Sequence, residues 1–277
     1  MSMRNWLITG ISSGLGAALA KAVMNDGDFV IGTFRQQRQV DTFNEQHEGK
    51  DKAYLLDLRD VESIASVVEN VLTEIGKVDV LVNNAGVGFI GAVEEASVKE
   101  VRQVFEVNVF GALKMTQAVL PQMRKERAGR IIQISSHGGL KAFAGFGIYN
   151  ASKFALEGFS EALAQEVAPL GIKVSIVEPG PFRTNFAGSG LGEASKIIED
   201  YNDTAGAFRA KLKGVHDKQE GDPDKAAQAI IDLSKSDSPS LRLPLGKTAL
   251  MTIGMKLDSV KADLENNRAV AENAVFE

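Results

Sequence analysis

The stretch Trp6-Leu7-Ile8-Thr9-Gly10-Ile11-Ser12-Ser13-Gly14-Leu15-Gly16 decides the fold of this chain. A short apolar run leads into a glycine-rich turn, and a segment with helical spacing follows over residues 15–25. Glycines let a backbone turn tightly and approach a ligand closely, while a helix N-terminus offers free amides to a pyrophosphate. The stretch predicts a strand, a phosphate-binding loop and a helix, although such a turn can also be a plain tight connection. We expect the nucleotide to contact Gly10, Ser12, Ser13, Gly14, Leu15 and Gly16.

The rest of the chain repeats this alternation of strand and helix. Short apolar runs rich in β-branched residues occupy residues 6–9, 29–34, 53–56, 78–83, 130–135, 174–178 and 241–245. Longer segments with helical spacing lie between them at 15–25, 61–75, 99–124 and 148–167. Strict alternation predicts a parallel sheet covered by helices on both faces. We therefore expect an α/β fold with a doubly wound parallel sheet of about seven strands, in one Rossmann-type domain spanning residues 1–277.

Composition excludes several functional classes. The formal net charge is −5 and the pI near 5.4, without a run of Lys and Arg, so we expect no nucleic-acid partner and no membrane partner. Cysteine is absent, and the three histidines, His47, His137 and His216, show no ligand spacing, so we expect no metal. The start of the chain is too short in apolar residues for a signal peptide. We expect a cytoplasmic protein.

Two late segments differ from the core of the fold. Residues 186–222 are rich in Gly, Ala, Asp and Lys and read as an insertion of one or two helices, which we expect to act as a substrate lid. The alternative is a surface excursion that only covers the sheet edge. After the last strand, residues 247–277 form a C-terminal tail, which we expect to be helical from residue 247 to about residue 267.

The end of the second strand indicates which nucleotide binds. It reads Gly32-Thr33-Phe34-Arg35 and has no carboxylate until Asp41. An acid at this place would accept hydrogen bonds from the ribose 2′-hydroxyl of NAD, whereas a guanidinium pairs with the 2′-phosphate of NADP. Arg35 therefore predicts NADP (NADPH) as the cofactor.

A Tyr and a Lys four residues apart, Tyr149 and Lys153, share one face of a predicted helix. A nearby ammonium lowers the pKa of a phenol, so the pair predicts an acid/base group. Alone, such a pair more often reflects ordinary helix packing, so its context must decide. Ser136 stands thirteen residues upstream, at the end of an apolar run.

With these features in one chain, the sequence resembles the compact single-domain branch of the short-chain dehydrogenase/reductase family over residues 5–186. Thr9 to Gly16 is similar to the family's Thr-Gly-x-x-x-Gly-x-Gly, and Asn83-Asn84-Ala85-Gly86 to the motif that ends its fourth strand. The resemblance implies four catalytic residues, which are Asn108, Ser136, Tyr149 and Lys153, with Ser135 as the alternative serine. It also implies cofactor contacts from Asp57, Leu58, Asn84, Ala85, Gly86, Tyr149, Lys153, Pro179, Gly180, Phe182 and Thr184. The matching Asn of the family kinks its helix, and His137 matches no catalytic position.

The resemblance implies NADP(H)-dependent interconversion of a carbonyl compound, a ketone or aldehyde, and its alcohol. Two alternatives stay open: a non-catalytic NADP-binding regulator on the same fold, and an epimerase or dehydratase of the extended branch, which Ser13 disfavours because a Gly stands there in that branch. Apolar residues of the insertion, with Phe143, Phe146 and Phe182, suggest a medium or bulky apolar carbonyl compound, although these side chains are equally compatible with the core. We expect a homodimer, since the Val-Asp-Gly-Gly-like ending common among the family's tetramers is absent.

Overall fold

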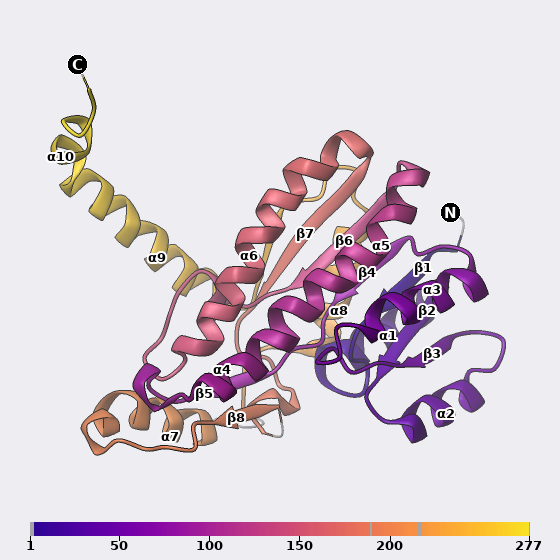
Figure 1. Ribbon diagram of the computed structural model, residues 1–277, viewed down its shortest axis with the longest axis horizontal. Helices are drawn as coiled ribbons and strands as arrows, with labels where there is room; N and C mark the ends of the chain where they lie inside the picture. Colours follow the sequence, from indigo (N-terminus) through magenta and orange to yellow (C-terminus); the bar gives the residue numbers. More distant parts are fainter. Residues whose placement is uncertain (1–2, 189, 215–217, 277) are drawn as a thin grey trace.

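The computed structural model describes residues 3–188, 190–214 and 218–276. Its centre is a seven-stranded parallel sheet in the order β3-β2-β1-β4-β6-β7-β9 (Figure 1). The strands are β1 (Asn5–Ile8), β2 (Phe29–Phe34), β3 (Lys52–Leu55), β4 (Val80–Asn83), β6 (Gly129–Ile134), β7 (Ile172–Pro179) and β9 (Arg242–Leu245). All seven predicted strands are present, with ends shifted by at most two residues. The predicted doubly wound sheet is confirmed.

Helices cover both faces of the sheet. One face carries α1 (Gly14–Asn25), α2 (Gln37–Gln46) and α8 (Pro223–Lys235), and the other carries α3 (Ser63–Ile75), α5 (Ala112–Glu126) and α6 (Gly147–Val167). The first strand shows why. Trp6 and Ile8 lie in the core under the first group, whereas Leu7 lies in the core under the second, and all three are fully buried.

The predicted helix over residues 99–124 is interrupted. Helix α4 (Val98–Phe105) begins at a capping box in which Ser97 and Glu100 satisfy one another's backbone amides. A π-helical segment, Glu106–Gly111, then joins it to α5. The prediction of one uninterrupted helix over residues 99–124 is therefore wrong. The π-helical segment contains Asn108, the residue at which a kink was expected.

Two helices on the sheet escaped prediction. Helix α2 is polar on all but one face, with only Val40 buried. Helix α8 begins at Asp222, whose carboxylate accepts hydrogen bonds from the amides of Asp224 (3.0 Å) and Lys225 (3.4 Å). Its apolar pattern is short and directly follows the insertion, so the sequence did not mark it as a separate helix.

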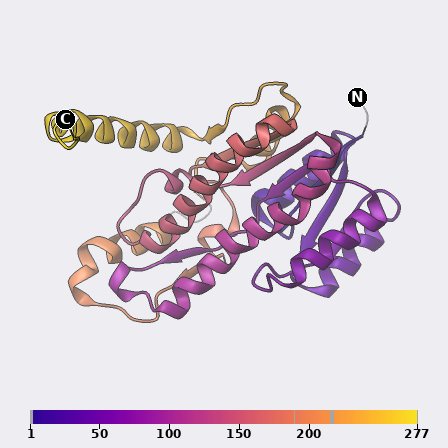
Figure 2. The same ribbon diagram turned by 45° about the horizontal axis from the view of Figure 1, so that its top comes forward.

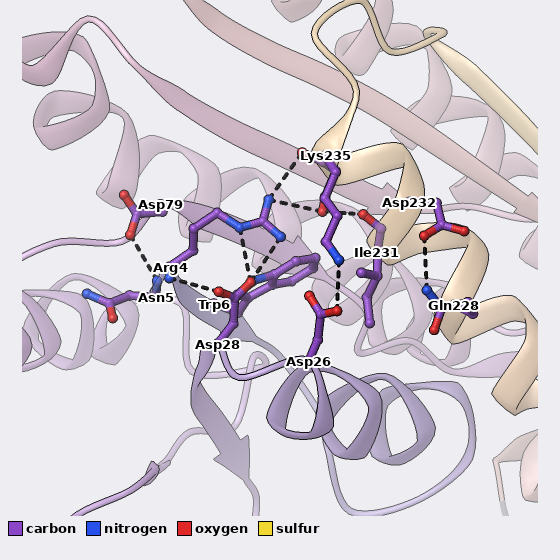
Figure 3. Close-up of polar contacts among 11 residues, drawn as sticks. Arg4, Asn5, Trp6, Asp26, Asp28, Asp79, Gln228, Ile231, Asp232 and Lys235 are labelled. Carbon is purple, nitrogen blue, oxygen red and sulfur yellow. Dashed lines mark hydrogen bonds and ion pairs between the residues drawn. The ribbon is translucent and has the colours of Figure 1, made fainter. Parts of the chain in front are cut away.

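Polar contacts fasten α8 to the start of the sheet (Figure 3). The guanidinium of Arg4 pairs with Asp28 at 2.9 Å and donates to the carbonyl of Ser234 at 3.2 Å. Lys235 pairs with Asp26 at 2.7 Å, and the indole of Trp6 donates to Asp28 at 2.8 Å. The first strand, the turn after α1 and the end of α8 are thereby joined.

Within its described residues, the insertion contains a π-helical segment, Asn202–Gly206, that leads into helix α7 (Ala207–Gly214), and a short strand, β8 (Leu191–Glu193). The strand pairs in parallel with β5 (Gly88–Ile90), which follows β4, in a separate two-stranded sheet that the sequence did not predict. Beyond β9 the tail forms α9 (Lys247–Asn266) and α10 (Arg268–Glu272), which extend away from the body in both views (Figures 1 and 2). Within the described ranges, no helix combines the length and the apolarity that crossing a membrane requires.

Candidate active site

The glycine-rich loop after β1 has the close packing that its sequence suggested. Gly10 and Gly14 adopt the left-handed backbone, with φ of 71° and 61°. A Cβ on Gly16 would lie 2.3 Å from Asn84 Nδ2 and 2.4 Å from the carbonyl oxygen of Gly10. Only a glycine fits there, so the start of α1 lies directly against the loop.

The loop is locked to the end of β4. The hydroxyl of Thr9 accepts hydrogen bonds from the amides of Asn84 and Ala85, both at 3.0 Å. The side chain of Asn84 donates to the carbonyls of Thr9 (2.8 Å) and Gly10 (3.1 Å). The Asn84 side chain therefore binds the loop itself.

A cavity of about 1040 Å³ runs from this loop along the carboxyl ends of the strands. This is the edge at which ligands bind in doubly wound sheets. Nineteen predicted residues line the cavity: Gly10, Ser12, Ser13, Gly14, Leu15, Gly16, Arg35, Asp57, Leu58, Asn84, Ala85, Gly86, Ser136, Tyr149, Lys153, Pro179, Gly180, Phe182 and Thr184. The fold brings together residues from six strand ends, and a dinucleotide fits a cradle of this shape and lining.

Two guanidinium groups lie at the end of the cavity near the glycine-rich loop (the nucleotide end). Arg35 follows β2, and Arg59 follows β3 as part of the same lining. Arg59 forms a short ion pair with Asp57, and this hydrogen bond is the main reason that the pKa of Asp57 is lowered. Asp57 therefore stays ionised and neutralised by Arg59. The sequence interpretation missed Arg59, although its place two residues after Asp57 was a usable signal.

Tyr149 and Ser136 meet at the other end of the cavity. Both side chains are buried, and a Cβ built on Gly138 would lie 3.2 Å from Ser136 Oγ and 3.5 Å from Tyr149 Cε1. Ser136 Oγ accepts a hydrogen bond from the amide of Gly138 at 3.0 Å, which leaves its proton free to be donated. Ser135 Oγ lies on the opposite side, near Glu157. The geometry favours Ser136 over Ser135.

The expected lowering of the Tyr149 pKa is wrong for this chain. Burial raises the pKa of Tyr149 to about 12, and a hydrogen bond with Ser136 offsets only part of that rise. Lys153 Nζ lies 5.9 Å from the centre of the Tyr149 ring and donates instead to the carbonyl of Ile134 at 2.8 Å. Burial also lowers the pKa of Lys153 to about 8. Desolvation outweighs the attraction that the i, i+4 spacing suggested.

Asn108 lies behind the cavity rather than in its wall. Its amide oxygen accepts a hydrogen bond from the amide of Val87 at 2.8 Å, and its nitrogen donates to the Val87 carbonyl (2.9 Å) and to Ser152 Oγ (3.0 Å). A Cβ built on Gly86 would lie 3.3 Å from Asn108 Oδ1 and 3.5 Å from Lys153 Nζ. The polar ends of Asn108 and Lys153 therefore lie close to the same point.

The Tyr149 end of the cavity is aromatic. The ring of Tyr149 lies 4.8 Å from that of Phe146 and 5.6 Å from that of Phe186, between centroids. Phe143 and Phe208 stack at 6.3 Å and join the same apolar cluster. Two of these four phenylalanines belong to the insertion. The insertion therefore supplies part of the cavity wall.

His137 lies at the rim of the cavity. Its Nδ1 is 2.9 Å from Thr252 Oγ1 on α9, and burial lowers its pKa. On the facing edge, Thr184 Oγ1 accepts a hydrogen bond from the amide of Phe186 at 3.3 Å, and Phe182 packs over Gly221. The described residues contain no cluster of side chains that could hold a metal ion.

A sequence profile described as short chain dehydrogenase matches residues 4–191. The chain belongs to the short-chain dehydrogenase family. Among its relatives, 3-ketodihydrosphingosine reductase of Bacteroides thetaiotaomicron is 40% identical over 87% of this chain and 87% of that protein.

Solved structures of the family agree with the fold. A short-chain dehydrogenase from Streptomyces avermitilis is 44% identical and superposes with a TM-score of 0.93 over 99% of this chain and all of that one. ElxO with NADP bound is 25% identical, with a TM-score of 0.74 over 90% of this chain and all of that one. The chain is thus an oxidoreductase of the dehydrogenase/reductase kind, in a family whose members include NADP-binding proteins.

Proposed function

We propose that this short-chain dehydrogenase is an NADP(H)-dependent oxidoreductase that interconverts a ketone or aldehyde and its alcohol. The observation that carries the proposal is a single cavity with Tyr149, Ser136 and Lys153 at one end, and Gly10, Gly14 and two guanidiniums at the other. The glycine cradle and the α1 N-terminus suit a pyrophosphate, and Arg35 with Arg59 suits a 2′-phosphate. The nicotinamide of bound NADPH would supply the hydride.

The chain's own residues handle the proton. With a pKa raised to about 12, Tyr149 keeps its proton at neutral pH and donates it to the oxygen of the carbonyl being reduced. Ser136 donates a hydrogen bond to the same oxygen, on which negative charge develops. Lys153 lies one helical turn from Tyr149 and favours the phenolate that forms. Asn108 binds the backbone of Val87, and its amide oxygen lies near Lys153 Nζ. A proton can be returned to Tyr149 by way of these two side chains.

Two measurements test this reaction. NADPH oxidation is followed across a panel of aromatic, aliphatic and polycyclic ketones and aldehydes, and we expect turnover of at least one class. Tyr149→Phe is expected to abolish turnover and to leave NADPH binding within about threefold, because the phenol hydroxyl acts on the substrate. A fully active variant would refute the role of Tyr149. Tight NADPH binding without turnover of any compound would favour the non-catalytic regulator.

We propose that the substrate carries a bulky apolar body. The wall beside Tyr149 consists of aromatic and aliphatic side chains, which are Phe89, Phe143, Phe146, Phe186, Leu191, Phe208 and Leu212. The relative from Bacteroides thetaiotaomicron is named for a ketone, 3-ketodihydrosphingosine, which supports a ketone here. We expect kcat/KM to rise with the apolar size of the ketone. A preference for small polar aldehydes would contradict this proposal.

The insertion at 186–222 is proposed to close over the substrate. A buried ion pair of 3.0 Å between Arg209 and Glu95 fastens its middle, and the amide of Ile198 donates to the same carboxylate at 2.9 Å. Phe186, which precedes this anchor, and Phe208, next to Arg209, both line the cavity. Hydrogen exchange with and without NADPH and a substrate tests the proposal. We expect slower exchange across residues 190–214 when both are bound, and unchanged exchange would contradict a lid.

A homodimer is proposed from the face formed by α5 and α6. Phe110 and Phe154 lie at 47% and 42% exposure on the two adjoining helical segments, although aromatic side chains of this size are usually buried. Light scattering should give twice the mass of the chain, and a tetrameric or monomeric mass would contradict this assembly. We also propose a cytoplasmic location, which fractionation of the cells that make the protein would test.

A further inference from the structure

A buried ionic cluster lies directly behind Lys153. One nitrogen of Arg242, Nη1, contacts both Glu157 and Glu178, at 2.6 Å in the case of Glu178. The two carboxylates have side-chain exposures of 4% and 0%. Glu161 reaches the other nitrogen, Nη2, but is half exposed. Three strand or helix elements, α6, β7 and β9, therefore meet at one guanidinium.

Only one of the two carboxylate oxygens of Glu157 has a hydrogen-bond partner. Its Oε2 binds Arg242, whereas its Oε1 is buried without a hydrogen-bond partner. Ser135 Oγ is buried and likewise makes no hydrogen bond of ordinary geometry, although its hydroxyl lies close enough to Glu157 to lower the pKa of that carboxyl. A Cβ built on Gly139 would lie 2.5 Å from Ser135 Oγ and 2.9 Å from Glu157 Oε1, so the two groups face one another across this glycine. An unpaired carboxylate oxygen in a buried place needs a positive charge nearby to stay ionised.

Arg242 supplies one such charge, and Lys153, on the same helix as Glu157, supplies a second. Lys153 and Glu157 are one turn apart on α6 and both are buried. The ammonium of Lys153 has a neutral partner, the Ile134 carbonyl, as its hydrogen bond. We propose that Glu157 is a positioning residue that keeps Lys153 charged, and that Arg242 keeps Glu157 ionised for that purpose. Any effect of Glu157 on turnover rests on the function proposed above, whereas its effect on the charge of Lys153 can be measured without turnover.

The charges around the pair support this direction. Within the described part of the chain, Lys153 lies on α6 one turn after Tyr149 and one turn before Glu157, and Glu157 contacts Arg242 of β9, which also contacts Glu178 of β7. Burial raises the pKa of Glu157, and Ser135, Arg242 and Lys153 each lower it. Burial lowers the pKa of Lys153 to about 8, and Glu157 opposes that effect.

Glu178 completes the balance of charge. Its pKa is raised to about 7, chiefly by burial and in part by repulsion from Glu157. Near neutrality it carries a proton part of the time. Glu157 is then the principal anion shared by Arg242 and Lys153.

Direct titration of Lys153 tests the inference without any need for turnover. The protein is made with 13C-labelled lysine, and the ε-methylene signal of Lys153 is assigned by its loss in Lys153→Met. In Glu157→Gln we expect the pKa of Lys153 to fall by about one unit, because an opposite charge one helical turn away has been removed. Ser135→Ala should give a smaller fall in the same direction, and it serves if Glu157→Gln does not fold.

Glu161→Gln is the matched control. Glu161 also pairs with Arg242 and lies one turn beyond Glu157, but it is half exposed, so the pKa of Lys153 should stay within 0.2 of the native value, about the precision of such a titration. An unchanged pKa in Glu157→Gln, or an equal fall in Glu161→Gln, would overturn the inference. In an active enzyme, the alkaline decline of carbonyl reduction should move down by about the same unit in Glu157→Gln. A shifted pKa in a protein without turnover would instead count against the proposed function alone.

Discussion

Arg35 is expected to set the preference for NADPH over NADH. Its exposed guanidinium lies at the nucleotide end of the cavity, and no protein hydrogen bond of its side chain competes among the described contacts. A charge-assisted hydrogen bond contributes roughly 1.5–3 kcal/mol and an exposed ion pair 0.2–1 kcal/mol, so an exposed guanidinium on a phosphate should contribute about 1.4 kcal/mol. Arg35→Ala should therefore weaken NADPH binding about tenfold and leave NADH binding within about twofold.

Arg59 should act differently, because its charge is already shared with Asp57. Arg59→Ala removes a cation and also exposes the carboxylate of Asp57 to the bound phosphate. The double variant with Arg35→Ala should lose more of its preference for NADPH than the roughly tenfold loss expected for Arg35→Ala alone, and the two effects need not multiply because both guanidiniums act on Asp57. Binding is measured by the fluorescence of each reduced cofactor at 50 and 300 mM salt, since screening should shrink the difference.

Arg38→Ala is the control for a general loss of positive charge. Arg38 is exposed on α2, three residues beyond Arg35, and does not line the cavity. Its removal should change neither affinity by more than about twofold, because exposed charges outside the site are screened. An Arg35→Ala protein with the native ratio of NADPH to NADH affinity would refute the assignment of this residue.

Three further substitutions test the packing around the site. Gly16→Ala should destabilise the protein by about 2 kcal/mol and weaken NADPH binding, because the new Cβ would overlap Asn84; native stability in urea would contradict the close packing. Asn108→Leu should cost about 3 kcal/mol in urea unfolding, because it removes three hydrogen bonds and leaves the Val87 amide unpaired, and a loss below about 1 kcal/mol would count against that support. Arg242→Met should cost about 3–5 kcal/mol at pH 8 and less at pH 5. The raised pKa of Glu178 explains why the loss depends on pH: below pH 7 its buried carboxyl is protonated and uncharged and needs Arg242 less, whereas above pH 7 it is a buried anion that needs this partner. An equal loss of stability at both pH values would contradict this reasoning.

The order of motifs predicted the fold and most of the site. Each strand that ends in a functional residue is a short apolar run, and parallel strands bring their carboxyl ends to one edge, so Gly10, Arg35, Asn84 and Ser136 had to meet. The break at Asn108 was also expected from its poor fit to a helix.

The rest depends on contacts that sequence spacing does not reveal. The i, i+4 spacing put Lys153 beside Tyr149, but the effect on the Tyr149 pKa is decided by burial, which only the packed structure gives. Arg242 is a single basic residue without a motif, and its buried partners come from two other elements. Arg59 pairs with Asp57 two residues away, a spacing that the prediction did not use. The pairing of β5 with β8 joins two segments about a hundred residues apart that are each too short to predict.

The position of Arg242 in the chain has a consequence for how the protein acquires activity during synthesis. Arg242 comes 85 residues after Glu157 and 64 after Glu178, and its strand is the outermost one of the sheet, paired only with β7. A ribosome-bound chain that has completed α6 and β7 holds both buried carboxylates without their guanidinium. Tyr149, Ser136 and Lys153 are all made by then, yet the charge balance around them is not. The arrival of the last strand completes this ion cluster, so if Tyr149 acts as proposed, we expect a nascent chain to lack full activity until β9 has paired with β7.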